Sequence, residues 1–291
     1  MNQEMTAALD RIHKGHKIIL REITRICRKH GIHYYLDSGT LIGAIRHKSA
    51  IPWDDDADIA MLRSDFEKFR RVAADELGPA FRYVEPDQLG NAVFDFVPRV
   101  VLLDSSIRPD SSEEQYYGNG IYNHLMVDIF IVDDVSDSDL FHLFCRGLLT
   151  IFYGFGLGHR YELDFSNYPG VTGVVVRVLA AIGKFLPARF IVRQYDRISK
   201  METGKNGEKN RCYFGNYLFG DIKLLYQKEW FGEPVDVLLD GETFPGPKNW
   251  HQCLELQYGD YMKLPPVEKR VQPHIQPQYV SISHPDMEDA D

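Results

Sequence analysis

Five carboxylates crowd into one stretch of this chain, YYLDSGTLIGAIRHKSAIPWDDDADIAM, which covers residues 34–61. Asp37 comes first, and Asp54, Asp55, Asp56 and Asp58 follow together. On a strand, three of the last four would project from one face, because alternate side chains point the same way. Carboxylates that close repel each other unless a proton or a cation lies between them. We therefore expect a hard divalent cation here, Mg²⁺ or Mn²⁺ in its place.

A lone carboxylate later in the chain supports the same metal site. Asp128 is the one charged residue of the apolar run LMVDIFIV, and a buried charge without a partner is costly. If its strand lies beside that of Asp56 and Asp58, Asp128 becomes the third ligand of the ion. We predict Asp56, Asp58 and Asp128 as metal ligands, and these three together with Asp54 as the catalytic carboxylates.

Three other interpretations explain the acidic run less well. A solvated loop would not lead directly into an apolar strand. A calcium loop of the EF-hand type needs glycine at its sixth position and glutamate at its twelfth, where this chain has Ile59 and Asp65. A cluster at a helix N-terminus needs a helix to follow, and the residues after Asp58 alternate like a strand.

The segment DSGTLIGAIRHK has the residues of an anion site. Its Ser-Gly-Thr lies at a predicted strand-to-helix junction, where free backbone N–H groups and the helix dipole favour a phosphate. The following Arg-His-Lys would hold further phosphate oxygens. A glycine turn, a basic trio and a carboxylate cluster within about twenty residues predict a site for a metal-bound polyphosphate. The residues predicted to bind this polyphosphate are Ser38, Gly39, Thr40, Arg46, His47 and Lys48.

The elements that must position these residues follow from periodicity. Apolar residues at helical spacing, with His16 among them, predict a helix that ends at Gly31. Strands are predicted at residues 32–39 and 56–62, and the apolar run around Asp128 predicts a central strand covered on both faces. Tyr116, Tyr117 and Tyr122 precede that strand. They would either form a cation–π cage for a cationic ligand group or pack a loop.

The middle of the chain, residues 136–205, is made of strongly apolar helices with isolated basic residues. One interpretation is a helical subdomain packed on the sheet. Another is a surface at a membrane interface, with Arg177, Lys184, Arg189 and Arg193 facing lipid head groups. The two are compatible. Residues 277–291 are rich in proline and acidic residues, and we predict a disordered tail.

The whole composition excludes several classes of protein. The net charge of −9 over 291 residues argues against a nucleic-acid partner. The chain has no run of twenty uncharged apolar residues, so we predict no transmembrane helix. The first twenty residues lack the order of a secretory signal. Four well-separated cysteines indicate reduced thiols rather than a zinc site or disulfides. We expect a cytoplasmic protein, or one peripheral on the inner face of the membrane.

The segment of residues 34–61 closely resembles the signature of the LicD family of phosphocholine transferases, relatives of the fukutin-related ribitol-phosphate transferases. MVDIFIVDD and FPGPKNWHQCLELQYGDYMKLPPVEKRVQPH are similar to later blocks of that family. The resemblance covers roughly residues 23–274 and is weakest in the helical middle. Ser49, Ala57 and Ile131 depart from the residues usual in the family, and they affect loop shape rather than any carboxylate.

The resemblance implies an α+β, nucleotidyltransferase-like fold: a small mixed sheet flanked by helices, with an inserted helical subdomain. It implies a catalytic core at 1–135, a helical insertion at 136–205, and a segment at 206–276 that completes the domain. The implied reaction moves a phospho-group, phosphocholine first, from a CDP-linked donor such as CDP-choline to a sugar hydroxyl of a surface glycan or glycolipid, and releases CMP. Asp56, Asp58 and Asp128 match its metal-binding carboxylates, and either Asp54 or Asp128 would be the general base.

Three alternatives stay open on the sequence alone. A nucleotidyltransferase would use the same metal geometry and attack the inner phosphorus. A nucleotide-sugar glycosyltransferase also uses an Asp-x-Asp motif, although it would place a nucleotide-binding sheet before that motif. A non-catalytic phosphate-binding module is the third.

Overall fold

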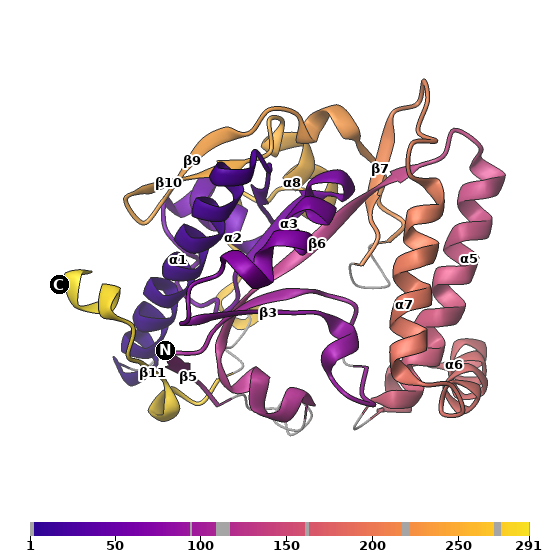
Figure 1. Cartoon of the computed structure of the whole chain (residues 1–291), viewed down its shortest axis with the longest axis horizontal. Helices are drawn as coiled ribbons and strands as arrows, with labels where there is room; N and C mark the ends of the chain where they lie inside the picture. Colours follow the sequence, from indigo (N-terminus) through magenta and orange to yellow (C-terminus); the bar gives the residue numbers. More distant parts are fainter. Residues whose placement is uncertain are drawn as a thin grey trace.

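The structure of the chain, a computed structural model, describes residues 3–93, 95–108, 117–160, 163–216, 222–270 and 275–290, without the side chains of 117–119, 269 and 288–290. Helices and strands mix along this chain, as predicted for an α+β protein (Figure 1). The helices are α1 (Gln3–His30), α2 (Ser38–Ile42), α3 (Arg63–Glu76), α5 (Asp139–Gly156), α6 (Gly170–Gly183), α7 (Ala188–Ser199) and α8 (Trp250–Tyr258). The strands are β1 (Tyr35–Leu36), β2 (Asp58–Leu62), β3 (Phe81–Val84), β4 (Arg99–Leu102), β5 (Ser105–Ser106), β6 (Leu125–Val135), β7 (Arg211–Phe214), β8 (Tyr226–Gln227), β9 (Val235–Leu239), β10 (Glu242–Gly246) and β11 (Ser281–Ile282).

The long strand β6 organises a mixed sheet of seven strands. On one edge β2 runs parallel to it. On the other edge its first half pairs antiparallel with β4 and its last residues pair antiparallel with β7. The path β1-β2-β6-β4-β3 forms the body of the sheet, and β8 extends it beyond β7. The prediction of a central strand around Asp128 is confirmed.

A single side chain spans the gap where β4 and β7 part along β6. There the backbone groups of Ile129 and Ile131 need other partners, because buried amides and carbonyls are rarely left unpaired. The Asn216 amide oxygen accepts a hydrogen bond from the Ile131 N–H at 2.7 Å, and its nitrogen donates to the Ile129 carbonyl at 3.1 Å. The same nitrogen donates to the Phe96 carbonyl at 3.3 Å.

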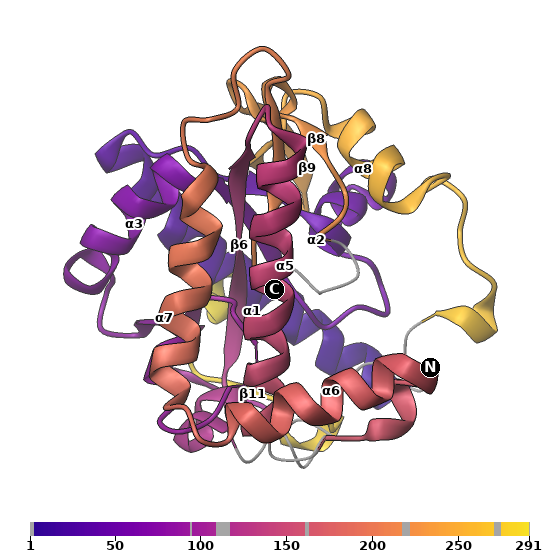
Figure 2. The same cartoon turned by 90° about the vertical axis from the view of Figure 1, so that its right-hand side faces the viewer.

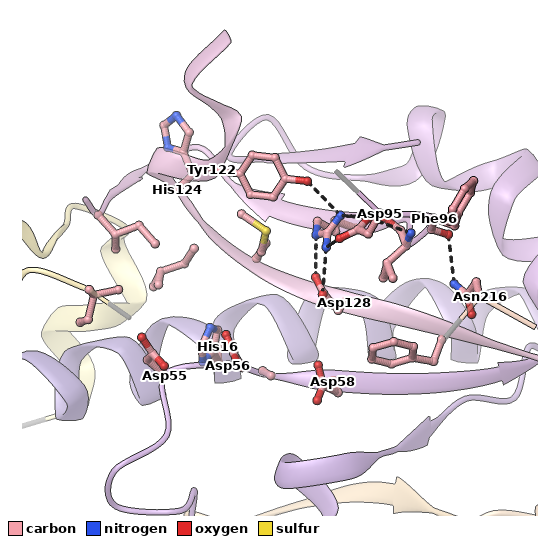
Figure 3. Close-up of a pocket in the computed structure, with 18 of the residues that line it drawn as sticks. His16, Asp55, Asp56, Asp58, Asp95, Phe96, Tyr122, His124, Asp128 and Asn216 are labelled. Carbon is pink, nitrogen blue, oxygen red and sulfur yellow. Dashed lines mark hydrogen bonds and ion pairs between the residues drawn. The ribbon is translucent and has the colours of Figure 1, made fainter. Parts of the chain in front are cut away.

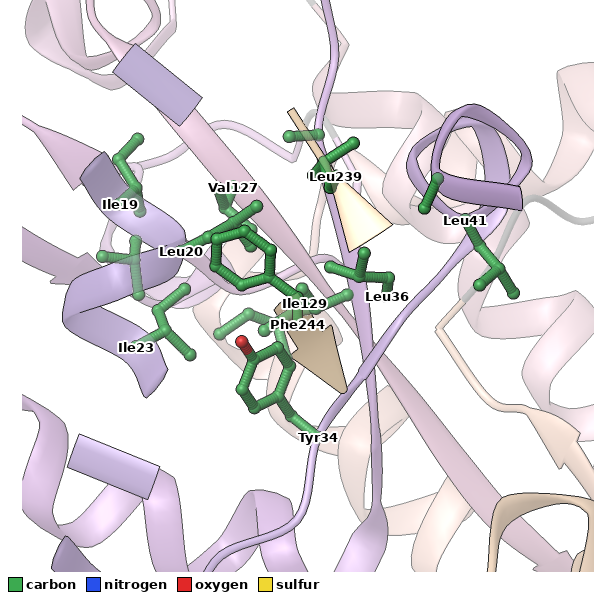
Figure 4. Packing of buried hydrophobic residues seen from close by; sticks show 14 of the residues in the cluster. Ile19, Leu20, Ile23, Tyr34, Leu36, Leu41, Val127, Ile129, Leu239 and Phe244 are labelled. Carbon is green, nitrogen blue, oxygen red and sulfur yellow. The ribbon is translucent and has the colours of Figure 1, made fainter. Parts of the chain in front are cut away.

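Helix α1 covers one face of this sheet, as the spacing of its apolar residues predicts. Figure 4 shows the contact, with Ile19, Leu20 and Ile23 packed beside Val127 and Ile129 of β6. Residues of β9, β10 and α8 belong to the same buried cluster. The chain after residue 206 therefore returns to complete the core that the first strands begin.

Helix α5 packs against both α6 and α7 beside the sheet, with α6 lying across the lower end of α5 (Figure 2). Their backbones approach closely: a Cβ atom on Gly183 would lie 2.1 Å from the Phe155 carbonyl oxygen. A buried arginine of α3 joins this bundle to the sheet. Arg63 bonds both carboxylate oxygens of Asp133 in β6, at 2.6 and 2.8 Å, and reaches Asp196 of α7 at 2.8 Å.

Two features bear on the sequence expectations. By length and composition alone, residues Asp139–His159 would be long and apolar enough to cross a membrane, although the core helix of a soluble protein meets the same test. Arg146 interrupts the uncharged run that the sequence criterion required, and the expectation of no membrane-spanning helix is not contradicted. Within the segment predicted as a disordered tail, Ser281–Ile282 pair with β5, and the Ile282 side chain lies close to Gly15 of α1.

Candidate active site

The parallel pairing of β2 and β6 brings two predicted carboxylates side by side. Asp58, the first residue of β2, is the register partner of Asp128 in β6. The β2 strand is held in place by its neighbours: the Asp37 N–H donates to the Asp58 carbonyl at 3.1 Å, and the Asp58 N–H donates to the Thr40 hydroxyl at 2.8 Å. Two acids far apart in the sequence thus meet at one position of the sheet.

These carboxylates line a cavity of about 500 Å³ (Figure 3). Its acidic wall is formed by Asp55, Asp56, Asp58, Asp95 and Asp128. Opposite charge comes from Arg99 and Arg160, and aromatic surface comes from Phe96, Tyr122, Phe130 and Tyr153. Tyr153 belongs to α5, so the helical region contributes directly to this cavity.

Burial disfavours the ionised form of the paired carboxylates in the absence of a cation. Burial raises the pKa of Asp58 well above its ordinary value, and the charges of Asp128 and Asp56 raise it further. Burial also raises the pKa of Asp128 to about 7, although Arg99 opposes the rise. A proton or a positive charge between these oxygens would therefore relieve their repulsion and stabilise the site. A divalent cation with carboxylate ligands fits this donor set.

Arg99 forms ion pairs with two carboxylates of the cavity. Its Nε lies 2.8 Å from Asp128 Oδ1, and its Nη2 bonds Asp95 at 2.5 Å. The guanidinium also lies 5.3 Å from the centre of the Tyr122 ring. Arg99 is therefore paired with two acids of the cavity, and it orients Asp128. Tyr116 and the side chain of Tyr117 lie outside the described residues.

The glycine turn lies at the predicted junction, between β1 and α2, but it faces Asp54. A Cβ atom on Gly39 would lie 2.5 Å from Asp54 Oδ2. Asp54, Gly39 and Thr40 line a second cavity of about 20 Å³, which shares Asp56 with the large one. Ser38, at the start of α2, has a positive φ of 48° and donates from its hydroxyl to Asp37. Of the four predicted catalytic aspartates, Asp56, Asp58 and Asp128 meet in the large cavity and Asp54 lies beside it.

The predicted basic trio is elsewhere. Arg46 donates to the Tyr261 carbonyl at 2.7 Å and to the His47 ring at 2.9 Å. His47 packs edge-on against Trp53, and Lys48 ends the helical turn in a left-handed conformation with φ 59°. Among the described residues, the linings of both carboxylate cavities contain no member of this trio.

Sequence reasoning missed several residues of the cavity. Asp95 and Asn216 lie in segments without periodicity, so no pattern marked them. His16 did carry a signal, because it is a polar residue on the apolar face of α1. It is 5% exposed and lines both cavities.

Comparison with known proteins gives a consistent result. Residues 31–90 match the family described as LicD/FKTN/FKRP, nucleotidyltransferase domain. The lipopolysaccharide cholinephosphotransferase LicD of Haemophilus influenzae is 29% identical over 273 residues, which are 90% of this chain and 94% of that protein. The ribitol 5-phosphate transferase FKRP of Mus musculus is 28% identical over 110 residues, 38% of this chain and 19% of that protein. The resemblance inferred from the sequence is confirmed.

Proposed function

With a LicD-type domain at residues 31–90 as the premise, we propose that this chain is a metal-dependent phosphotransferase. It moves phosphocholine from CDP-choline to a sugar hydroxyl of a glycan or glycolipid and releases CMP. The observation that carries the proposal is the register of β2 and β6, which places Asp58 against Asp128 in a cavity of about 500 Å³. The sheet around this pair is proposed to be of the nucleotidyltransferase type.

The cation is assigned to the carboxylates of the large cavity. Asp56, Asp58 and Asp128 would hold Mg²⁺, or Mn²⁺ in its place, which supplies charge neutralisation on the donor phosphates. The raised pKa values of Asp58 and Asp128 support this assignment, because bringing such groups together is favourable only with a cation to bind.

The remaining steps belong to protein side chains. The acceptor oxygen attacks the phosphorus that bears choline, the bond from that phosphorus to the bridging oxygen breaks, and CMP leaves with that oxygen. Asp128 accepts the proton of the attacking hydroxyl. Asp54 is the weaker choice for this base, because its carboxylate lies against Gly39. Arg99 holds Asp128 in position through the 2.8 Å contact.

Aromatic side chains favour choline as the transferred group. Phe96, Tyr122, Phe130 and Tyr153 line the same cavity as the carboxylates. Aromatic faces attract a quaternary ammonium through their quadrupoles. The name of the Haemophilus influenzae relative, a cholinephosphotransferase, supports the same choice.

The helices beside the cavity suit a lipid-linked acceptor at a membrane surface. Large apolar side chains are exposed along α6 and just beyond it at helical spacing: Val171, Val174, Val175, Val178, Ile182 and Phe185. Leu140, Leu143, Phe144 and Ile151 form a similar row on α5. Residues 140–193 contain six Lys and Arg against two Asp and Glu, whereas the whole chain has 33 against 42. This charge would favour anionic lipid head groups.

The reaction is tested by product analysis. Purified protein is incubated with CDP-choline and Mg²⁺, with and without a sugar acceptor. We expect CMP that depends on the acceptor and disappears in Asp58→Asn. Release from CDP-ribitol or CDP-glycerol alone would keep the mechanism and change the transferred group. Pyrophosphate from nucleoside triphosphates, with no CMP from any CDP donor, would replace the proposal with nucleotidyl transfer.

A further inference from the structure

His16 projects from α1 into the acidic part of the molecule. It lines the large cavity (Figure 3) and also the small one, and Asp56 lines both as well. Its side chain is almost fully enclosed, with 5% exposure. A histidine on the buried face of a helix normally bonds a neighbouring polar group.

Among the described residues, the His16 ring makes no hydrogen bond to such a group. In the described part of the chain, neither ring nitrogen makes a hydrogen bond, although almost every other buried polar side chain there has one. A neutral imidazole offers the lone pair that a metal ion requires.

The carboxylates that line the same two cavities as His16 include a ligand cluster. Asp54, Asp55 and Asp56 each offer an oxygen atom, and these oxygens lie within 4.8 Å of one another. The same loop is fixed to α1 one turn before His16, because the His13 ring lies 2.7 Å from the Asp54 carbonyl oxygen and bonds it. His13 and His16, three residues apart, lie on one side of the helix.

We propose that His16 is a nitrogen ligand of a divalent cation held by the Asp54–Asp56 loop. This site is next to the Asp58–Asp128 pair and shares Asp56 with it, but its donor set differs. One imidazole among carboxylates favours Mn²⁺, Co²⁺ or Zn²⁺ over Mg²⁺, which prefers oxygen ligands alone. The inference rests on the proposed function in one respect, that the cavity region binds a divalent cation.

Electron spin-echo spectroscopy of bound Mn²⁺ tests the ligand directly and does not depend on turnover. The full chain is loaded with less than one equivalent of Mn²⁺. We expect modulation from a directly coordinated ¹⁴N nucleus, which changes to the ¹⁵N pattern when histidine alone is labelled. The modulation should vanish in His16→Gln and persist in His13→Gln and His124→Gln. His124 is the matched control, because it lines the same large cavity.

Two results would overturn the proposal: Mn²⁺ that binds without nitrogen modulation, or modulation that survives in folded His16→Gln. If His16→Gln does not fold, the His13→Gln/His124→Gln double variant replaces it. There the nitrogen signal must persist, and Mn²⁺ must bind at least about tenfold more tightly than Mg²⁺. Equal affinity without a nitrogen signal contradicts the proposal. A nitrogen signal in a protein that releases no CMP would refute the proposed function and leave this inference standing.

Discussion

In the sheet around β6 the large apolar side chains face inward, whereas on α5 and α6 many face solvent. Ile129 and Val127 of β6 are fully buried, while Phe185 and Val171 at the two ends of α6 are 90% and 81% exposed. The charges differ in the same sense: acids gather at the cavity, and bases predominate among residues 140–193. Under the proposed function, the first region would hold a cation, and the second leaves apolar surface that a partner could cover.

The family model matches residues 31–90, which contain Asp58 and the glycine turn, whereas similarity to the Haemophilus influenzae relative extends over 90% of the chain. From the contrast in burial and charge, we expect that chemistry resides in the sheet and that location or acceptor choice resides in the helices. Four predictions test this division, beginning with the largest effect.

Removing one carboxylate of the paired strands should separate the two regions most sharply. We expect Asp58→Asn to lower turnover by about a thousandfold or more, because the donor phosphates lose their cation. Binding to anionic vesicles should stay unchanged. Asp54→Asn serves as the control, with a smaller loss, since Asp54 lies outside the large cavity. Equal losses in both variants would contradict the assignment of Asp58.

Breaking the link between the regions should cost stability instead. In Arg63→Met the fully buried Asp133 loses its partner, and removing one member of a buried ion pair costs about 3 kcal/mol or more. Denaturant unfolding measures this loss. Arg71→Met, on the exposed side of the same helix, should change the free energy of unfolding by less than about 0.5 kcal/mol.

The metal-free protein should become less stable as pH rises toward 7. Asp128 keeps its proton in the folded state up to a pKa of about 7, whereas the unfolded chain loses it near the ordinary value of 3.8. Between these values the native state holds more protons, so its stability falls by up to about 1.4 kcal/mol per pH unit. Unfolding in a chelator should show a shallower slope for Asp128→Asn. An unchanged slope would refute the raised pKa.

The smallest expected effect concerns the exposed helix face. Val178→Ser/Phe185→Ser should weaken binding to anionic vesicles by about tenfold, because apolar surface is lost from the interface. Turnover on a soluble acceptor should remain. Met262→Ser/Val267→Ser is the matched control, since those residues are also exposed but lie outside the helical region. No flotation of the parent protein with anionic vesicles would remove the membrane proposal.

The sequence was sufficient where local pattern and chemistry agree. The alternation after Asp58 and the single charge in the run around Asp128 predicted two strands that had to meet, and they are neighbours in register. Contacts between segments that are far apart in the chain could not be predicted from the sequence. Nothing in the segment around Arg46 shows that it turns toward Tyr261, because that contact depends on how a segment two hundred residues later folds back. Asn216 could not be predicted for the same reason, because it bonds the backbone of β6 only at the point where β4 and β7 part.

The register of β2 and β6 also bears on how the chain folds. Asp58 and Asp128 are far apart along the backbone, and closing such a loop costs entropy before any contact compensates for it. Parallel pairing of this kind is slow compared with helix formation. The carboxylate pair is therefore assembled late, after α1 and α5–α7 have formed much of their helical structure. A refolding chain should gain helical circular dichroism first and the ability to bind Mn²⁺ only in its final phase.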